Sequence, residues 1–298
     1  MLLTALSAVS RRVGALPSRN AKVVQIAALL RRLAPDEVEI GASWLSGTLR
    51  QGRSGIGYAL IRDARPPTFA ATPSLTLAEV DAALGRIADT RGPGSARARV
   101  RLLAGLLSRA TADEYEFLTR LVLGELRQGA LDGLMIDAVA AAAGVPVKAV
   151  RRAAMVGGGI VAVAHSALGE GGSALGRHAM AVFAPVAPML AQAADDVESA
   201  MPPRGMAALE WKLDGARIQA HKRWGEVRIY SRTGKDVTAA VPEVVAAVRD
   251  ADAHTLILDG EAIALKPDGA PYPFQETMSR FGRVLDIDEM RKRYPLSV

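Results

Sequence analysis

The sequence of 298 residues contains no cysteine, only four histidines and only 4% aromatic residues. Without cysteine the chain has no disulfide, no thiolate zinc site, no iron–sulfur cluster and no cysteine nucleophile. The histidines are scattered at 165, 178, 221 and 254, which argues against a metal site built from histidine. The sequence therefore excludes thiol chemistry and argues against the common transition-metal sites.

A secretory signal and a membrane span are also lacking. Arg11 and Arg12 follow the apolar residues of the amino terminus, whereas a secretory signal has its basic residues first. The longest uncharged run, 153–169, contains His165 and three consecutive glycines and is short for a membrane helix. With 50% hydrophobic and 23% charged residues, we expect a globular protein of the cytoplasm, monomeric and without membrane contact.

The charge balance favours a polyanionic partner. Lys and Arg exceed Asp and Glu by 37 − 31 = +6. Residues 1–200 carry 22 − 17 = +5 of this excess and residues 201–298 only 15 − 14 = +1. Nucleic acid is the first candidate partner of the first 200 residues, and an ordinary solvated basic surface is the alternative.

Apolar spacing divides the chain into a helical part at 1–200, a linker at 201–205 and a mixed part at 206–298. In the helical part Thr76 and Thr111 each stand three positions before a glutamate, the pattern of an N-terminal capping box. The helices that we expect near the end of this part are 115–128, 132–143, 146–155 and 161–168. Alternation in the mixed part predicts strands at 207–213, 216–222, 227–232 and 255–265, with helices at 242–249 and 274–281. The expected fold is an all-α domain followed by an α+β domain.

The segment Glu210-Trp-Lys-Leu-Asp-Gly-Ala-Arg217 concentrates reactive side chains. Alternation along a strand puts Glu210, Lys212 and Asp214 on one face. Gly215 permits a tight bend, after which Arg217 can return toward the same pocket from the next strand. A lysine amine has an ordinary pKa of about 10.4, so it becomes a nucleophile only where its surroundings lower that pKa. The group suits attack by Lys212 on phosphorus, and a salt-bridged surface hairpin is the alternative.

The pattern Lys212-x-Asp-Gly-x-Arg217 resembles the nucleotidyl-accepting lysine motif of the covalent nucleotidyltransferases, the superfamily of ligases and mRNA-capping enzymes. Two further segments resemble that family's next elements in the expected order, Tyr230-Ser-Arg-Thr-Gly234 and Leu258-Asp-Gly-Glu261. With the stretch from Pro273 to Gly282 and the preceding helical part, nearly the whole chain resembles bacterial and archaeal ATP-dependent DNA ligases.

The resemblance implies roles for individual residues. Lys212 would be the adenylated lysine, and Glu210 would read the edge of the adenine. Arg217 would lie near the ribose and phosphate, Arg232 would contact phosphate, and Glu261 would hold the ribose hydroxyls. Positions that would support these groups are Asp214, Gly215 and Asp259. Without the neighbouring motifs, Arg232 and Glu261 would be interpreted as solvated charges at strand ends.

In the helical part, the stretch from Glu116 to Gly129 resembles the DNA-binding domain of the same ligases. The resemblance implies contact with duplex DNA through Arg120, Arg127 and Gly129, without sequence preference. On one continuous helix, Arg120 and Arg127 would lie two turns apart on the same face. Ion pairs of these arginines with Glu116 and Glu125 are the alternative.

The implied function is an ATP-dependent DNA ligase that seals nicks in duplex DNA through a lysyl-AMP intermediate, in replication, repair or recombination. ATP would be the nucleotide, and Mg²⁺ would neutralise phosphate charge. Such ligases continue with further motifs and an OB-fold domain, but only 298 − 261 = 37 residues follow Glu261. We therefore expect an incomplete adenylation domain and no OB-fold domain. The alternatives are a non-catalytic DNA-binding module and a related RNA ligase or guanylyltransferase.

Overall fold

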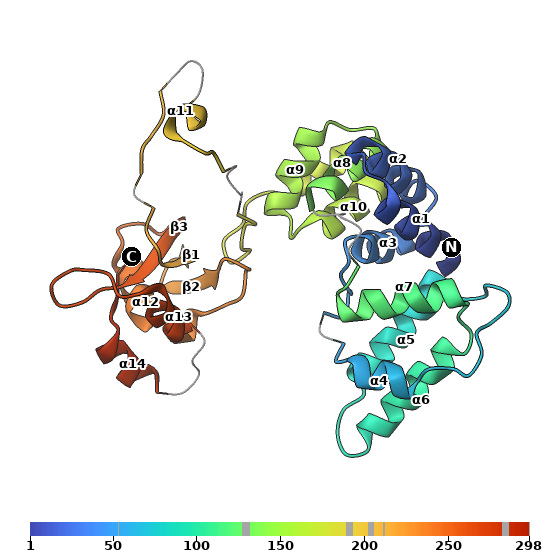
Figure 1. The fold of residues 1–298 in the computed structure, drawn as a ribbon. Helices are drawn as coiled ribbons and strands as arrows, with labels where there is room; N and C mark the ends of the chain where they lie inside the picture. The colour runs from blue at the N-terminus through green and yellow to red at the C-terminus, as the bar shows by residue number, and fades with distance from the viewer. Residues whose placement is uncertain are drawn as a thin grey trace. The chain divides into compact units, whose positions relative to one another are not determined.

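Helices build the first of two units in the computed structural model, Met1–Ala179, and a small sheet builds much of the second, Met180–Val298 (Figure 1). The structure describes residues 1–52, 54–126, 132–188, 193–201, 206–210, 212–281 and 286–297. Among these residues, no helix combines the length and the apolar character that a membrane crossing requires.

The helical unit is held by a core of aliphatic side chains around Trp44, which is fully buried and lies 6.5 Å from the ring of Phe117. Its helices are α1 (Leu3–Ala15), α2 (Arg19–Leu30), α3 (Val38–Leu45), α4 (Tyr58–Asp63), α5 (Leu77–Asp89), α6 (Ser95–Leu107), α7 (Ala112–Leu123), α8 (Asp132–Ala143), α9 (Val147–Val156) and α10 (Ile160–Gly169), with short 3₁₀ turns η1 (Pro35–Glu37) and η2 (Gly172–Arg177). The predicted helices at 132–143, 146–155 and 161–168 are confirmed within two residues at each end.

Both predicted capping boxes are present. The Glu79 amide donates to the Thr76 hydroxyl at 3.2 Å, and the Thr76 amide donates to Glu79 Oε2 at 2.9 Å. Thr111 and Glu114 repeat this exchange at the start of α7. The hydrogen bond from the Thr76 amide, with help from the Thr76 hydroxyl and Arg109, lowers the pKa of Glu79 to about 2. Each box satisfies backbone donors that a helix start otherwise leaves unpaired.

The predicted helix at 115–128 is wrong at its carboxyl end. α7 stops at Leu123 because Gly124 adopts a left-handed conformation with φ of +70°, and the Glu125 amide then donates back to the Arg120 carbonyl at 2.8 Å. This is the usual glycine termination of a helix. α7 therefore ends before position 127, whereas Arg127 and Gly129 lie outside the described residues, so that the expected alignment of Arg120 with Arg127 stays a prediction.

The sheet of the second unit is antiparallel, with the strand order β2-β1-β3-β4. Its strands are β1 (Ala216–Arg223), β2 (Glu226–Ser231), β3 (Thr255–Ala264) and β4 (Leu296–Ser297), and its helical elements are α11 (Val197–Ala200), η3 (Thr238–Ala240), α12 (Pro242–Asp250), α13 (Phe274–Phe281) and α14 (Ile287–Arg293). The predicted strands at 216–222, 227–232 and 255–265 and both predicted helices are thereby confirmed. The predicted strand at 207–213 is wrong, since residues 206–210 and 212–214 have no strand assignment. Alternating side chains do not make a strand unless a neighbour pairs with its backbone.

The two faces of the sheet differ. On one face Ile218 and Ala220 of β1 pack with Ile229 and with Val244 of α12 in an apolar core. The other face carries Arg217, Gln219, His221 and Arg223 of β1, and residues 183–186 lie against it. Gln219 exchanges two hydrogen bonds with the backbone of Val186, at 2.9 and 2.6 Å. Residues 180–188 therefore belong with the sheet although they precede the predicted linker at 201–205.

A buried arginine joins the helices of this unit. Arg280 of α13 has only 1% of its side chain exposed and forms an ion pair with Glu243 of α12 at 2.7 Å. Its guanidinium also donates to the Tyr294 carbonyl at 2.8 Å and to the Ala240 carbonyl at 3.3 Å. α13 is thereby fixed to α12 and to the chain that leads into β4.

Candidate functional site

A cavity of about 1050 Å³ opens in the second unit and is called the sheet cavity below. It brings together every site residue predicted for the mixed part of the chain, namely Glu210, Lys212, Asp214, Gly215, Arg217, Arg232, Asp259 and Glu261. These residues come from the segment before β1, from β1 itself, from the turn after β2 and from β3. Its size is at the upper end for small-molecule sites, which measure roughly 300–1,000 Å³.

Arg217 and Asp259 form a two-bond ion pair in the sheet cavity. Arg217 Nε donates to Asp259 Oδ1 at 3.1 Å and Arg217 Nη2 to Asp259 Oδ2 at 2.6 Å. In the strand register Arg217 stands opposite Glu261, so Asp259 reaches it diagonally across β1 and β3. The bond to Asp259 raises the pKa of Arg217 above its ordinary value. The pair holds a permanent cation in one orientation at the edge of the cavity.

Gly215 lets the chain approach β3 closely at the start of β1. Its amide donates to Glu261 Oε1 at 3.2 Å, so the carboxylate of Glu261 is oriented by the backbone. A β-carbon at position 215 would lie 2.6 Å from the carbonyl oxygen of Ala262 and 2.8 Å from Cγ of Glu261. The approach is therefore open only to glycine.

Lys212 lies in the segment before β1, together with Glu210 and Asp214. All three side chains are exposed and line the sheet cavity. Their placement round one cavity is what the sequence predicts, although the strand expected to align them is not formed. Their individual chemical roles stay predictions.

The turn that follows β2, residues 231–235, supplies two further cations to the cavity, Arg232 and Lys235. Two backbone hydrogen bonds close it, from the Ser231 amide to the Lys235 carbonyl at 2.9 Å and from the Gly234 amide to the Ser231 carbonyl at 2.8 Å. Gly234 has a φ of +77°, which favours glycine. Lys235 is not among the predicted site residues, and its place in the same tight turn as Arg232 is the signal that could have indicated it.

An apolar wall completes the cavity. Phe274, Met278 and Phe281 of α13 line it at helical spacing, and about two fifths of Phe274 and of Met278 is exposed, at 39% and 40%. Behind them Thr277 is buried and accepts a hydrogen bond from the Ala264 amide of β3 at 3.2 Å. Their spacing of four and three positions indicates one helix face from the sequence alone. The cavity therefore joins cations and carboxylates to one apolar helix face.

A preformed metal site is not found in the described part of the chain, where no group of three or more His, Asp or Glu side chains could hold an ion. Asp259 is engaged by Arg217, and Glu261 by the Gly215 amide. Mg²⁺ at nucleotide sites takes one or two carboxylates together with phosphate oxygens and water. The other carboxylates of the cavity lining are those of Glu210 and Asp214, which are too few for a site built from protein ligands alone.

In the helical unit, Arg120 lines a separate cavity of about 230 Å³ between α1 and α7. Arg120 forms an ion pair with Glu116 at 3.1 Å, and Arg11 forms one with Asp113 at 2.7 Å. The ion-pair alternative for Arg120 is therefore present in the structure. Contact of Arg120 with DNA stays a prediction, and Arg127 and Gly129 cannot be placed.

Two family models match the chain. The model described as ATP dependent DNA ligase domain covers residues 188–298, and the model described as DNA ligase N terminus covers residues 54–140. The first includes the whole sheet cavity and the second includes α7 with Arg120. The chain belongs to the ATP-dependent DNA ligase family.

Curated relatives agree with this assignment. A protein named probable DNA ligase from Anaeromyxobacter dehalogenans is 58% identical over 300 residues, which cover 100% of this chain and 58% of the relative. One of the same name from Sorangium cellulosum is 50% identical over 297 residues, covering 99% of this chain and 56% of the relative. The chain thus spans under three fifths of the length of these relatives. The solved structure titled Pmar-Lig_PreS3 is similar to this chain with a TM-score of 0.52 and 17% identity. The match covers 93% of this chain and 53% of the chain in that structure, and it supports the fold alone.

Proposed function

We propose that this chain provides the DNA-gripping and nucleotide-accepting parts of an ATP-dependent DNA ligase that seals nicks in duplex DNA. The observation that carries the proposal is the single cavity round which all eight predicted residues of the second unit gather. The names of the relatives and the two family matches support the same activity.

In the first proposed step, the neutral amine of Lys212 attacks the α-phosphorus of ATP. A nitrogen–phosphorus bond forms, the bond between the α-phosphorus and the bridging oxygen breaks, pyrophosphate leaves, and the proton of the amine passes to solvent. AMP then moves from Lys212 to the 5′-phosphate of the nick, and the 3′-hydroxyl displaces it to form the phosphodiester. Each transfer is favoured by fixed positive charge near the phosphates.

In this proposal, different side chains of the sheet cavity bind the phosphates, the base and the ribose of the nucleotide. Arg217, Arg232 and Lys235 supply positive charge for the phosphates, and the apolar wall of α13 gives the base a surface. Glu261, oriented by the Gly215 amide, would accept from the ribose hydroxyls, and Glu210 would accept from the exocyclic amine of adenine. Mg²⁺ would arrive with the phosphates and neutralise part of their charge.

The helical unit would hold the nicked duplex. The net charge of +5 over residues 1–200, which contain this unit, supports contact with the phosphate backbone, which is independent of base sequence. Such binding should weaken steeply as salt rises, because the release of counterions from DNA gains less entropy when the salt concentration is high. The monomeric state and the cytoplasmic location stay predictions from the sequence.

The test is incubation of the full chain with α-labelled ATP or GTP, followed by separation under denaturing conditions. Covalent label from ATP that is lost in Lys212→Ala and kept in Lys148→Ala, an exposed lysine of α9, supports the proposal. Label from GTP alone would favour a guanylyltransferase. Binding of duplex DNA without any label would favour the non-catalytic module.

A further inference from the structure

A short segment outside the sheet cavity lies against the same face of the sheet. We call residues 183–186 the brace. The Phe183 amide donates to Nδ1 of His221 at 2.9 Å, and Val186 exchanges two hydrogen bonds with Gln219. Gln219 stands two positions after Arg217 on β1, so the brace begins on the sheet face where the cavity ends. His221 is fully buried and Gln219 is 9% exposed.

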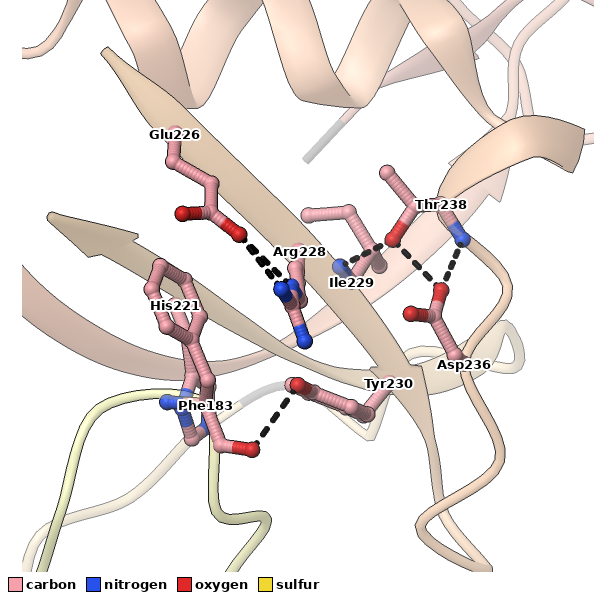
Figure 2. Close-up of polar contacts among 8 residues, drawn as sticks. All are labelled: Phe183, His221, Glu226, Arg228, Ile229, Tyr230, Asp236 and Thr238. Atoms are coloured by element: carbon pink, nitrogen blue, oxygen red, sulfur yellow. Dashed lines mark hydrogen bonds and ion pairs between the residues drawn. The ribbon is translucent and has the colours of Figure 1, made fainter.

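The brace also contacts the turn that carries the cavity's cations. The buried hydroxyl of Tyr230 donates to the carbonyl oxygen of Phe183 at 3.0 Å, and Ser231, the next residue, is the first of the turn (Figure 2). A β-carbon at position 234 would lie 3.4 Å from Cγ of Pro185, so Pro185 sits directly on the backbone of Gly234. Two contacts thus hold this part of the chain against the brace, one at Tyr230, just before the turn, and one at Gly234, within it.

The backbone on either side of the turn is joined by a second set of hydrogen bonds. Thr238 donates from its hydroxyl and from its amide to Asp236 Oδ1, at 2.6 and 2.9 Å, and its hydroxyl accepts from the Ile229 amide at 2.9 Å. Figure 2 shows these bonds on the side of β2 away from Phe183. The turn has its own two backbone bonds, and the residues that flank it are held by side chains that do not line the cavity.

The ring of Phe183 anchors the brace. The guanidinium of Arg228 lies 4.7 Å from the ring centroid and that of Arg223 lies 5.6 Å from it. Glu226 holds Arg228 in place through two hydrogen bonds, at 2.9 and 2.6 Å. Cation–π contacts of this kind add to the four hydrogen bonds that the brace makes with the sheet.

We propose that Tyr230 and the brace are positioning elements for Arg232, acting through the 231–235 turn. The proposal rests on the proposed function, in which Arg232 meets the phosphates of ATP. Arg232 is long and exposed, so the place of its guanidinium depends on how rigidly the turn is held. A displacement of about 1 Å at a phosphate-binding group costs a large part of its effect. The Tyr230 hydroxyl contributes through its bond to Phe183 and not through contact with the nucleotide.

Tyr230→Phe removes the hydroxyl, with its bond to Phe183 and its interaction with Arg228, and keeps the ring. Tyr58→Phe on the exposed surface of α4 is the matched control. Hydrogen exchange in the full chain should show faster exchange of the Ser231 and Gly234 amides in Tyr230→Phe only. Binding of ATP to the Lys212→Ala chain, measured by calorimetry, should weaken by about 3- to 10-fold when Tyr230→Phe is added, the effect of one lost hydrogen bond. In an Arg232→Ala background the same change should have no further effect.

Unchanged exchange at Ser231 and Gly234 would show that the brace does not hold the turn. Faster exchange with unchanged ATP affinity, or an equal loss of affinity with and without Arg232, would refute the positioning role. Failure of Lys212→Ala to bind ATP when Tyr230 is intact would refute the proposed function instead, and the exchange comparison would then decide on the brace alone.

Discussion

Arg217 and Asp259 meet across two strands through two hydrogen bonds, although 42 positions separate them in the sequence. Because 36% and 47% of the two side chains are exposed, the pair should contribute less than about 1 kcal/mol to the free energy of unfolding. Its larger effect is to orient a cation toward the cavity. We expect Asp259→Asn to leave the melting temperature nearly unchanged and to weaken ATP binding several-fold, as measured by calorimetry on Lys212→Ala. Asp252→Asn, an exposed carboxylate outside the cavity, is the control, and tighter ATP binding by Asp259→Asn would mean that Asp259 competes with phosphate.

Arg280 should be the most sensitive charged side chain of the second unit. Arg280→Met leaves the carboxylate of Glu243 without its cation in a site where only 14% of that side chain is exposed. Loss of one partner of a buried ion pair costs about 3–5 kcal/mol. Denaturant unfolding monitored on this unit should show a loss of that order, and Arg291→Met in α14 should change it by less than about 0.5 kcal/mol. The double variant Arg280→Met, Glu243→Leu should recover part of the loss, and an additive double variant would contradict the ion-pair explanation.

His221 should make the attachment of residues 183–186 sensitive to pH. Burial lowers the pKa of His221 below its ordinary value of 6.5, so the folded chain holds the ring neutral, with Nδ1 free to accept from the Phe183 amide. The unfolded chain binds a proton more readily, so this contribution to stability is complete above pH 6.5 and is lost as pH falls below it. The protection factor of the Phe183 amide, which removes the intrinsic pH dependence of exchange, should therefore fall below pH 6.5. His221→Asn, which keeps an acceptor but does not titrate, should remove this dependence, whereas His254→Asn should not.

Glu79 should titrate near pH 2. Its folded pKa lies below the ordinary value of 4.5, so its contribution to the start of α5 is present above pH 4.5 and is lost as pH falls toward 2. A carboxyl titration followed by NMR should give a midpoint near 2 for Glu79. Thr76→Ala should raise that midpoint, because the Thr76 hydroxyl is the second contributor to the low pKa. A midpoint near 4.5 in the unaltered chain would contradict the capping geometry.

The sequence predicts those elements whose cause is local. The boxes at Thr76 and Thr111 and the alternation over 216–222 act within a few residues, and the structure confirms them. The end of α7 at Gly124 is also local, but the apolar pattern continues past it and conceals the stop. In the segment 207–213 the alternation is clear but no strand is assigned to its described residues. A strand also needs a neighbour to pair with, and that requirement is non-local and cannot be seen in the alternation.

Most charged residues of the candidate site are predicted from the sequence, but Lys235, the apolar wall of α13 and the internal geometry of the site are not. The residues round the sheet cavity stand in short motifs, so their gathering follows once the order of strands is right. The pairing of Arg217 with Asp259, rather than with Glu261 opposite it, depends on side-chain reach across two strands. The contacts of Phe183 and Pro185 could not be foreseen, because no pattern in the sequence connects residues 183–186 to β2.

The crowding at Gly215 makes the site sensitive to a substitution that removes no functional group. A single methyl group there would overlap the Ala262 carbonyl and the side chain of Glu261. The first residues of β1 would have to move away from β3, and Lys212 and Asp214 would move with them while Glu261 lost its amide partner. A chain altered in this way would keep every polar side chain of the sheet cavity and lose the strand register that gathers them round it.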